Sequence, residues 1–168
     1  MINNSITSKL FEQIAKAKKD AFHLLSFRAH STAELRQKLL RKKYSAEIVE
    51  EVILFCSQQG LLDDAKFAKL YALSRIQSRP MGKKMIQFAL RNKGVAPALV
   101  ERALDSLEDF DEKQIALESA LKRYRHMTEL APNVSKARLY GFLKRRGFSD
   151  EAVSHALSKL CGQTEASL

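Results

Sequence analysis

Apolar residues recur along most of this chain at spacings of three and four positions, which is the period of a helix that buries one face. Between residues 82 and 104 the spacing forms two short stripes, Ile86 to Leu90 and Leu99 to Leu104. Gly94 lies between them where a left-handed helix cap is needed, and Pro97 suits the first turn of a second helix. The segment is therefore predicted to be two helices joined by a tight turn.

This two-helix segment occurs three times. Its turn residues Lys43, Gly94 and Gly147 lie at equivalent positions, 51 and then 53 residues apart. Repetition at such a period is typical of proteins in which each unit buries its apolar face on its neighbours. The aligned apolar positions are Leu35, Ile86 and Leu139; Leu39, Leu90 and Leu143; Tyr44, Val95 and Phe148; Val49, Val100 and Val153; and Ile53, Leu104 and Leu157.

Each copy is preceded by one further helical stretch, so the pattern predicts nine helices in three triplets. Capping residues support the predicted starts: Ser31 with Glu34 forms a capping box, and Asp63, Ser135 and Ser149 precede other helices. The expected fold is all-α, with three tandem helix-turn-helix-like repeats that form an elongated, curved solenoid. The predicted divisions are a flexible tail over 1–7, repeats over 8–60, 61–108 and 109–161, and a flexible tail over 162–168.

Charge follows the repeat. The chain carries 29 Lys and Arg against 19 Asp and Glu, a formal net charge of +10. The second helices, over 32–43, 82–93 and 135–146, hold 14 cations and only one acid, Glu34, whereas the third helices are acidic. The C-terminus of a helix stabilises a nearby cation by about 0.3–1 kcal/mol. This effect explains about one cation per helix, whereas these helices carry four or five.

A stripe of positive potential on these second helices suits phosphate or an acidic protein surface, and a merely solvated basic face is the alternative. Base-specific readout is less expected, because no Asn/Gln/Arg cluster and no aromatic column mark a recognition surface. The cations nominated for the contact are Arg36, Arg41, Lys42, Lys84, Arg91, Lys93, Lys144, Arg145 and Arg146.

Catalytic and metal-binding motifs are not recognisable in the sequence. It contains no Gly-x-x-x-x-Gly-Lys-Ser/Thr loop, no nucleophile motif and no paired histidines, so no catalytic residue, metal or cofactor is expected. Asp63 and Asp64 are interpreted as helix-start residues, with a Mg²⁺ site as the alternative. Cys56 and Cys161 are expected to be buried free thiols in a cytoplasmic protein. Neither an 18-residue apolar run nor a secretory signal pattern is present, so no membrane contact is expected.

Five motifs in this order make the chain resemble the RecX family, the regulators of the bacterial RecA recombinase. They are Ala29–Leu35, Gly60–Ala68, Arg75–Gly82, Lys93–Val95 and Phe142–Phe148. The resemblance covers about residues 18–160, and Pro80, Met81 and Lys43 depart from the family pattern.

The resemblance implies a modulator, mainly an inhibitor, of RecA. Such a protein binds the groove of the RecA–DNA filament or blocks its extension, and suppresses strand exchange, ATP hydrolysis and co-protease activity. The expected partners are the RecA filament and, weakly and without sequence preference, single- and double-stranded DNA, bound by a monomer. Two alternatives stay open. One is a sequence-specific helix-turn-helix regulator, and the other is a non-specific nucleic-acid-binding protein without a recombinase partner.

Overall fold

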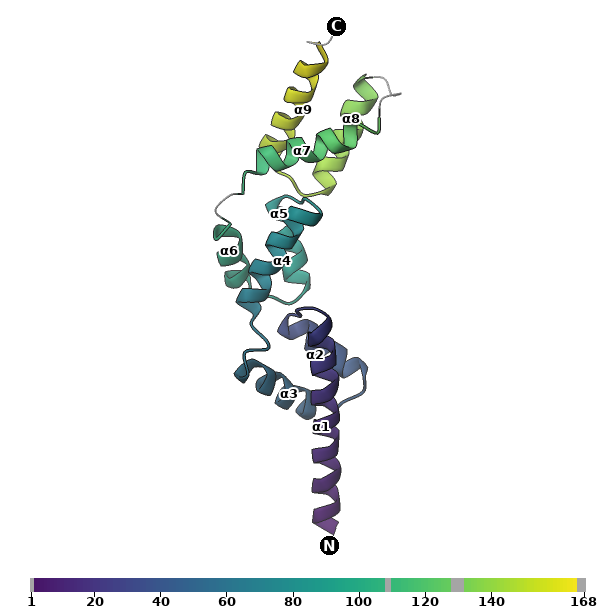
Figure 1. Ribbon diagram of the computed structural model, residues 1–168, viewed down its shortest axis with the longest axis vertical. Coiled ribbons are helices and arrows are strands. Elements are labelled where there is room, and N and C mark those ends of the chain that lie inside the picture. The colour runs from purple at the N-terminus through teal and green to yellow at the C-terminus, as the bar shows by residue number, and fades with distance from the viewer. Residues whose placement is uncertain (1, 108–109, 128–131, 166–168) are drawn as a thin grey trace. The chain divides into compact units, whose positions relative to one another are not determined.

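The computed structural model describes the backbone over residues 2–107, 110–127 and 132–165, and the side chains over 8–107, 110–127 and 133–160. Within these ranges the elements are helices and no strand occurs, as the apolar spacing predicts (Figure 1). The helices are α1 (Ile2–Phe27), α2 (Thr32–Arg41), α3 (Ala46–Gln58), α4 (Asp64–Ser78), α5 (Lys83–Asn92), α6 (Pro97–Asp105), α7 (Glu112–Tyr124), α8 (Pro132–Arg145) and α9 (Asp150–Glu165).

Most predicted helix boundaries are confirmed by their caps. Ser31 and Glu34 form the reciprocal capping box of α2, and the Asp63 carboxylate accepts a hydrogen bond of 2.9 Å from the Lys66 N–H at the start of α4. The turn residues Lys43, Gly94 and Gly147 all have left-handed backbones, with φ of 66°, 74° and 76°. Only Lys43 carries a side chain there, at a cost of about 1 kcal/mol.

Three boundaries differ from the prediction. Ser135 was expected to cap α8, but the helix begins at Pro132, whose missing N–H costs nothing in a first turn. Ser135 is consequently buried inside the helix, so its predicted capping role is wrong. The α1 backbone already begins at Ile2, and α9 continues to Glu165, so the helices extend into both segments that were expected to be tails.

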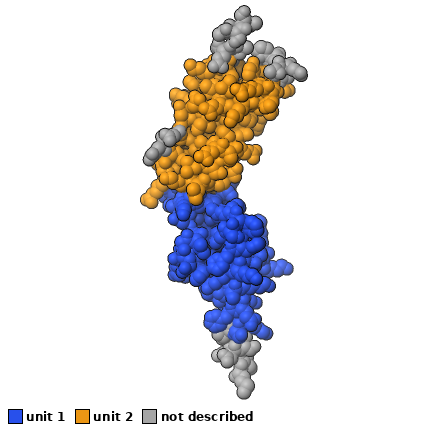
Figure 2. Space-filling model, viewed as in Figure 1, with its two compact units in different colours: residues 1–68, 91–99 blue, residues 69–90, 100–168 orange. Residues whose placement is uncertain are grey.

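Two compact units divide the chain, residues 1–68 with 91–99 and residues 69–90 with 100–168 (Figure 2). In the first unit, α1 packs against α2 and α3 around Leu35, Leu39, Val49 and Val52. In the second unit, α7 packs against α8 and α9 around Leu139, Leu143, Phe148 and Val153. The aligned apolar positions are buried except Tyr44, which is half-buried because its hydroxyl donates to Asp20 over 2.8 Å.

Two glycines allow backbones within a unit to approach closely. The Gly82 N–H donates to the Arg146 carbonyl over 2.9 Å, and a Cβ at Gly82 would overlap the Gly147 carbonyl. A Cβ at Gly94 would overlap that of Ala33, at the start of α2. Gly94 is therefore required both by the left-handed backbone of its turn and by the close packing against Ala33.

Candidate nucleic-acid and protein interface

Four of the nine nominated cations form ion pairs inside the molecule. Arg36 binds both carboxylate oxygens of Glu50, at 2.6 and 3.0 Å. The other three pairs are Lys42 with Asp20 at 2.9 Å, Lys93 with Glu34 at 2.6 Å and Lys144 with Asp150 at 2.7 Å. Such pairs reduce the charge that these side chains can offer to a partner.

The Glu34 carboxylate is the centre of an ion network in the first unit. It accepts hydrogen bonds from the Arg28 guanidinium at 3.1 and 3.2 Å and from the Lys93 ammonium at 2.6 Å. Burial of the carboxylate opposes its ionisation, but the hydrogen bonds from Arg28, Lys93 and the Ser31 N–H outweigh burial and lower the pKa of Glu34 to about 2. The Ser31 hydroxyl also donates to the Lys93 carbonyl. Lys93 therefore fastens the turn after α5 to the start of α2.

Arg146 is also held internally. Its guanidinium donates to the Pro80 carbonyl over 2.9 Å and lies over the Phe142 ring, 4.9 Å from the centroid. Burial lowers the pKa of Arg146, and the charge of Arg79 lowers it further. Arg146 therefore connects the turn after α8 to the link before α5.

The remaining nominated cations, Arg41, Lys84, Arg91 and Arg145, are exposed and form no ion pair with a described carboxylate. Arg91 lines a cavity of about 320 Å³ in the first unit together with the paired cations Arg36 and Lys93. Arg145 lines a cavity of about 340 Å³ in the second unit.

The structure adds Arg123 and Arg138 beside Arg145, and neither was nominated from the sequence. Arg123 lies on α7, outside the basic second helices. Arg138 lies on α8, but away from the end of that helix where the nominated cations lie. The absence of any acid from α8 was the available signal for Arg138.

The neighbouring aspartates bind helix backbone groups. Asp63 caps α4, whereas Asp64 accepts a hydrogen bond of 2.8 Å from the Thr32 N–H. This second bond satisfies an N–H at the start of α2, which sequence reasoning had no means to detect. The part of the chain that the structure describes holds no group of three His, Cys, Asp or Glu side chains arranged to bind a metal.

Among the described side chains outside the basic helices, two titratable groups are buried, Cys56 and His30. Cys56 is buried, as predicted, and burial raises the pKa of its thiol. Cys161 lies outside the described side chains. His30 is also buried; its Nδ1 lies 3.0 Å from the Arg28 carbonyl, and burial lowers its pKa. Neither group has a described partner that would make it a nucleophile or a base.

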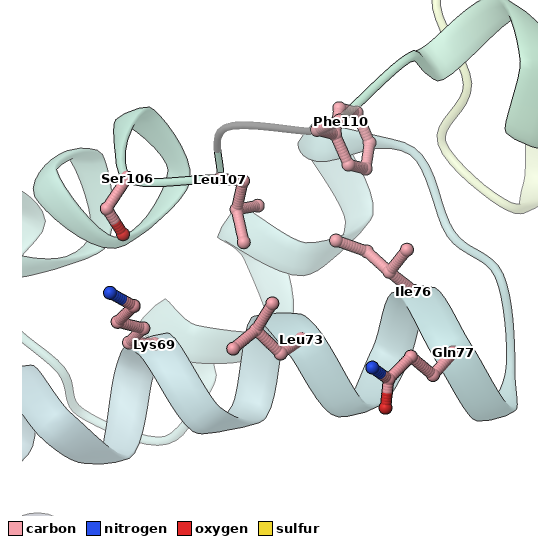
Figure 3. Close-up of a pocket in the computed structure, with 7 residues that line it drawn as sticks. All are labelled: Lys69, Leu73, Ile76, Gln77, Ser106, Leu107 and Phe110. Atoms are coloured by element: carbon pink, nitrogen blue, oxygen red, sulfur yellow. The ribbon is translucent and has the colours of Figure 1, made fainter.

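A further cavity of about 360 Å³ lies in the second unit between α4 and the segment after α6. Figure 3 shows Leu73 and Ile76 of α4 on one side and Leu107 and Phe110 on the other, with Lys69 and Ser106 at one end. The Ser106 hydroxyl donates to the Ala103 carbonyl over 3.0 Å, so it belongs to its own helix end. The lining is therefore mixed, with four apolar side chains, two neutral polar ones and one cation.

None of the helices in the described ranges is long and apolar enough to cross a membrane.

Comparison with known proteins identifies three consecutive family domains. Residues 17–56 match the first three-helix domain of RecX, residues 63–104 the second, and residues 111–157 the third. The chain is similar to the regulatory protein RecX of Chlorobium limicola, with 36% identity over 140 residues that cover 83% of this chain and 86% of the relative. It is also similar to the regulatory protein RecX of Vibrio vulnificus, with 34% identity over 141 residues, 84% of this chain and 90% of the relative.

Solved structures support the fold. A crystal structure of RecX from Lactobacillus salivarius superposes with a TM-score of 0.74 at 21% identity and covers 89% of this chain and 97% of its own. A second crystal structure, of a regulatory protein RecX, gives a TM-score of 0.75 at 25% identity and covers 84% of this chain and 71% of its own. Both likenesses support the all-α repeat architecture.

Proposed function

This chain belongs to the RecX family of regulatory proteins, and from that premise we propose that it modulates a RecA-type recombinase, mainly as an inhibitor. It binds the recombinase–DNA filament through the basic face of its helices and suppresses strand exchange, ATP hydrolysis and co-protease activity. The observation that carries the proposal is the succession of three RecX domains, in each of which the second helix and its adjoining turn are basic. Residues 32–43, 82–93 and 135–146 together carry 14 cations and a single acid. It acts as a monomer in the cytoplasm, without a catalytic residue or a cofactor.

The ion pairs divide the nominated cations into two groups with different proposed roles. Arg41, Lys84, Arg91 and Arg145 are exposed, so they make the first contact with the filament. The other five are already held by carboxylates or by a carbonyl, and they shape the basic surface rather than bind first. They are Arg36, Lys42, Lys93, Lys144 and Arg146.

The test is the DNA-dependent ATPase of the cognate recombinase on single-stranded DNA. The variant carrying Arg41→Glu, Lys84→Glu and Arg91→Glu reverses three exposed charges that form no described ion pair, so it should fold as the wild type does. Its melting temperature should fall only slightly, because Arg41 and Arg91 leave the last turns of α2 and α5, where cations are favoured. We expect this variant to lose inhibition. A matched control with Lys9→Glu and Lys19→Glu changes exposed cations of α1, outside the basic second helices, and should still inhibit.

Retained inhibition by the triple variant would overturn the assigned surface. Inhibition by wild type at ratios well below one per recombinase protomer supports blocking of filament ends, whereas inhibition that needs near-equal amounts supports binding along the filament.

A wild-type protein that binds DNA but leaves the ATPase unchanged up to saturation would overturn the recombinase proposal. It would favour the non-specific nucleic-acid-binding alternative. A large preference for one duplex sequence would instead favour the helix-turn-helix regulator.

A further inference from the structure

Three arginines from two helices converge on the cavity of about 340 Å³ in the second unit. Arg123 comes from the last turn of α7, and Arg138 and Arg145 lie seven residues apart on one face of α8. All three residues line the same cavity, together with Gly141 and Phe142.

None of these arginines is neutralised by a described carboxylate. Neither α7 nor α8 places an acid three or four residues from any of them, and the sequence of α8 contains no acid. The C-terminal end of a helix attracts cations, and this effect is a sufficient reason for Arg123 at the end of α7 and Arg145 at the end of α8. Arg138 lies in the middle of α8, where that effect is absent. The three cations therefore lie together without a described carboxylate beside them, which leaves them available to an anionic ligand.

The Phe142 ring helps to position the cations. The Arg123 guanidinium lies over it at 6.0 Å from the centroid, and Arg146, fixed by the Pro80 carbonyl, lies over it at 4.9 Å. Guanidinium groups stack favourably on aromatic rings, and such stacking orients their N–H donors. The ring is therefore used to hold arginines inside the protein.

Gly141 lines the cavity without a side chain of its own. A glycine inside a helix lowers helix stability relative to alanine, and this one has no left-handed backbone that would require it. A Cβ built on Gly141 would meet only the Arg145 side chain, 3.1 Å from Nη1. The missing side chain leaves room for the Arg145 guanidinium to lie against α8 at Gly141.

We propose that this cavity binds a phosphodiester group of single-stranded nucleic acid. Planar guanidinium groups match phosphate oxygens in pairs, and three of them together suit a polymer whose negative charges repeat along its length, because one phosphodiester carries a single charge. Lys122 and Arg125 are two further exposed cations at the end of α7, and this density of positive charge suits a ligand with a charge on every nucleotide. The site reads the backbone and has no base preference.

The assignment deepens the proposed function and rests on it, because it names the DNA group that the third repeat holds in a recombinase filament. Its test omits the recombinase, so that the two proposals fail separately. The full-length protein is titrated into fluorescein-labelled oligo(dT), and binding is followed by anisotropy over a series of salt concentrations. Arg138→Gln and Arg123→Gln should each weaken binding about three- to tenfold and lower the salt slope by about 0.7. Arg102→Gln, an exposed arginine on the acidic helix α6, should change neither quantity.

Gly141→Ala separates binding from folding. Alanine favours the helix, so the melting temperature should rise by about 1–3 °C, while the displaced Arg145 should weaken oligo(dT) binding. A merely structural role for Gly141 predicts no loss of binding in a more stable protein.

Two competitors identify the ligand class. Unlabelled oligo(dC) should displace labelled oligo(dT) as well as oligo(dT) does, whereas poly-glutamate of equal charge should compete at least tenfold less well. Equal competition by poly-glutamate would assign the cavity to acidic protein and overturn the proposal, and so would wild-type affinity in the arginine variants. Arginine variants that lose oligo(dT) binding, in a protein that never inhibits the recombinase, would sustain the phosphate site and reject the proposed function.

Discussion

Replacing Glu34 by glutamine tests how much the ion network contributes to stability. The substitution keeps the shape of the side chain and its ability to accept from the Ser31 N–H, but removes the charge that Arg28 and Lys93 share. The Glu34 side chain is only 16% exposed, and its pKa falls from 4.5 to about 2 in the folded protein. A shift of this size corresponds to roughly 3 kcal/mol. We expect a loss of about 2–3 kcal/mol at pH 7, because half-exposed Arg28 is partly screened by water.

The sign of the pH dependence follows from the lowered pKa. The unfolded carboxyl titrates near 4.5 and the folded one near 2, so the stabilisation is complete above about pH 5 and is lost as the pH falls towards 2. Urea unfolding followed by circular dichroism should therefore show a large deficit for Glu34→Gln at pH 7 and a small one at pH 2.5. Glu50→Gln, which breaks an exposed pair with Arg36, should cost less than about 1 kcal/mol. A Glu34→Gln deficit that is equal at both pH values would refute the reasoning.

Three further substitutions or reactions probe the fold. Lys43→Gly removes a left-handed side-chain strain and should raise the free energy of unfolding by about 1 kcal/mol, measured by urea titration; a loss would contradict the strained cap. Gly82→Ala forces a Cβ into the Gly147 carbonyl and should lower the melting temperature well beyond Gly60→Ala, which meets only backbone strain in open space; equal losses would refute the close approach. Cys56, buried and with a raised pKa, should react with a thiol reagent only at the rate of unfolding; fast labelling of the native protein in a Cys161→Ser background would be inconsistent with its burial.

The basic surface was only partly predictable. Charge counting selected the second helices but treated every cation on them as equivalent. Lys93 and Glu34 are 59 residues apart, and Arg146 and Pro80 are 66 residues apart. A pattern of neighbouring residues therefore cannot predict either contact. The arginine cavity was missed for a similar reason, because Arg123 belongs to a first helix and meets Arg138 only when α7 packs against α8. The division into repeats, the curvature of the array and the identity of the cations that bind a partner stay predictions.

The sequence by itself determined the features that depend on neighbours within about one helical turn. The apolar period, the capping box at Ser31 and the left-handed residues at Lys43, Gly94 and Gly147 all follow from i to i+4 relations, and the structure confirms them. Ser135 shows the limit of such rules. It is a good capping residue, but the helix begins three positions earlier, at Pro132. Only tertiary packing decided which charges remain available. Two opposite charges form an ion pair, and offer less charge to a partner, when the fold brings them within about 3 Å. That distance is set by how the helices pack and not by the order of the residues along the chain.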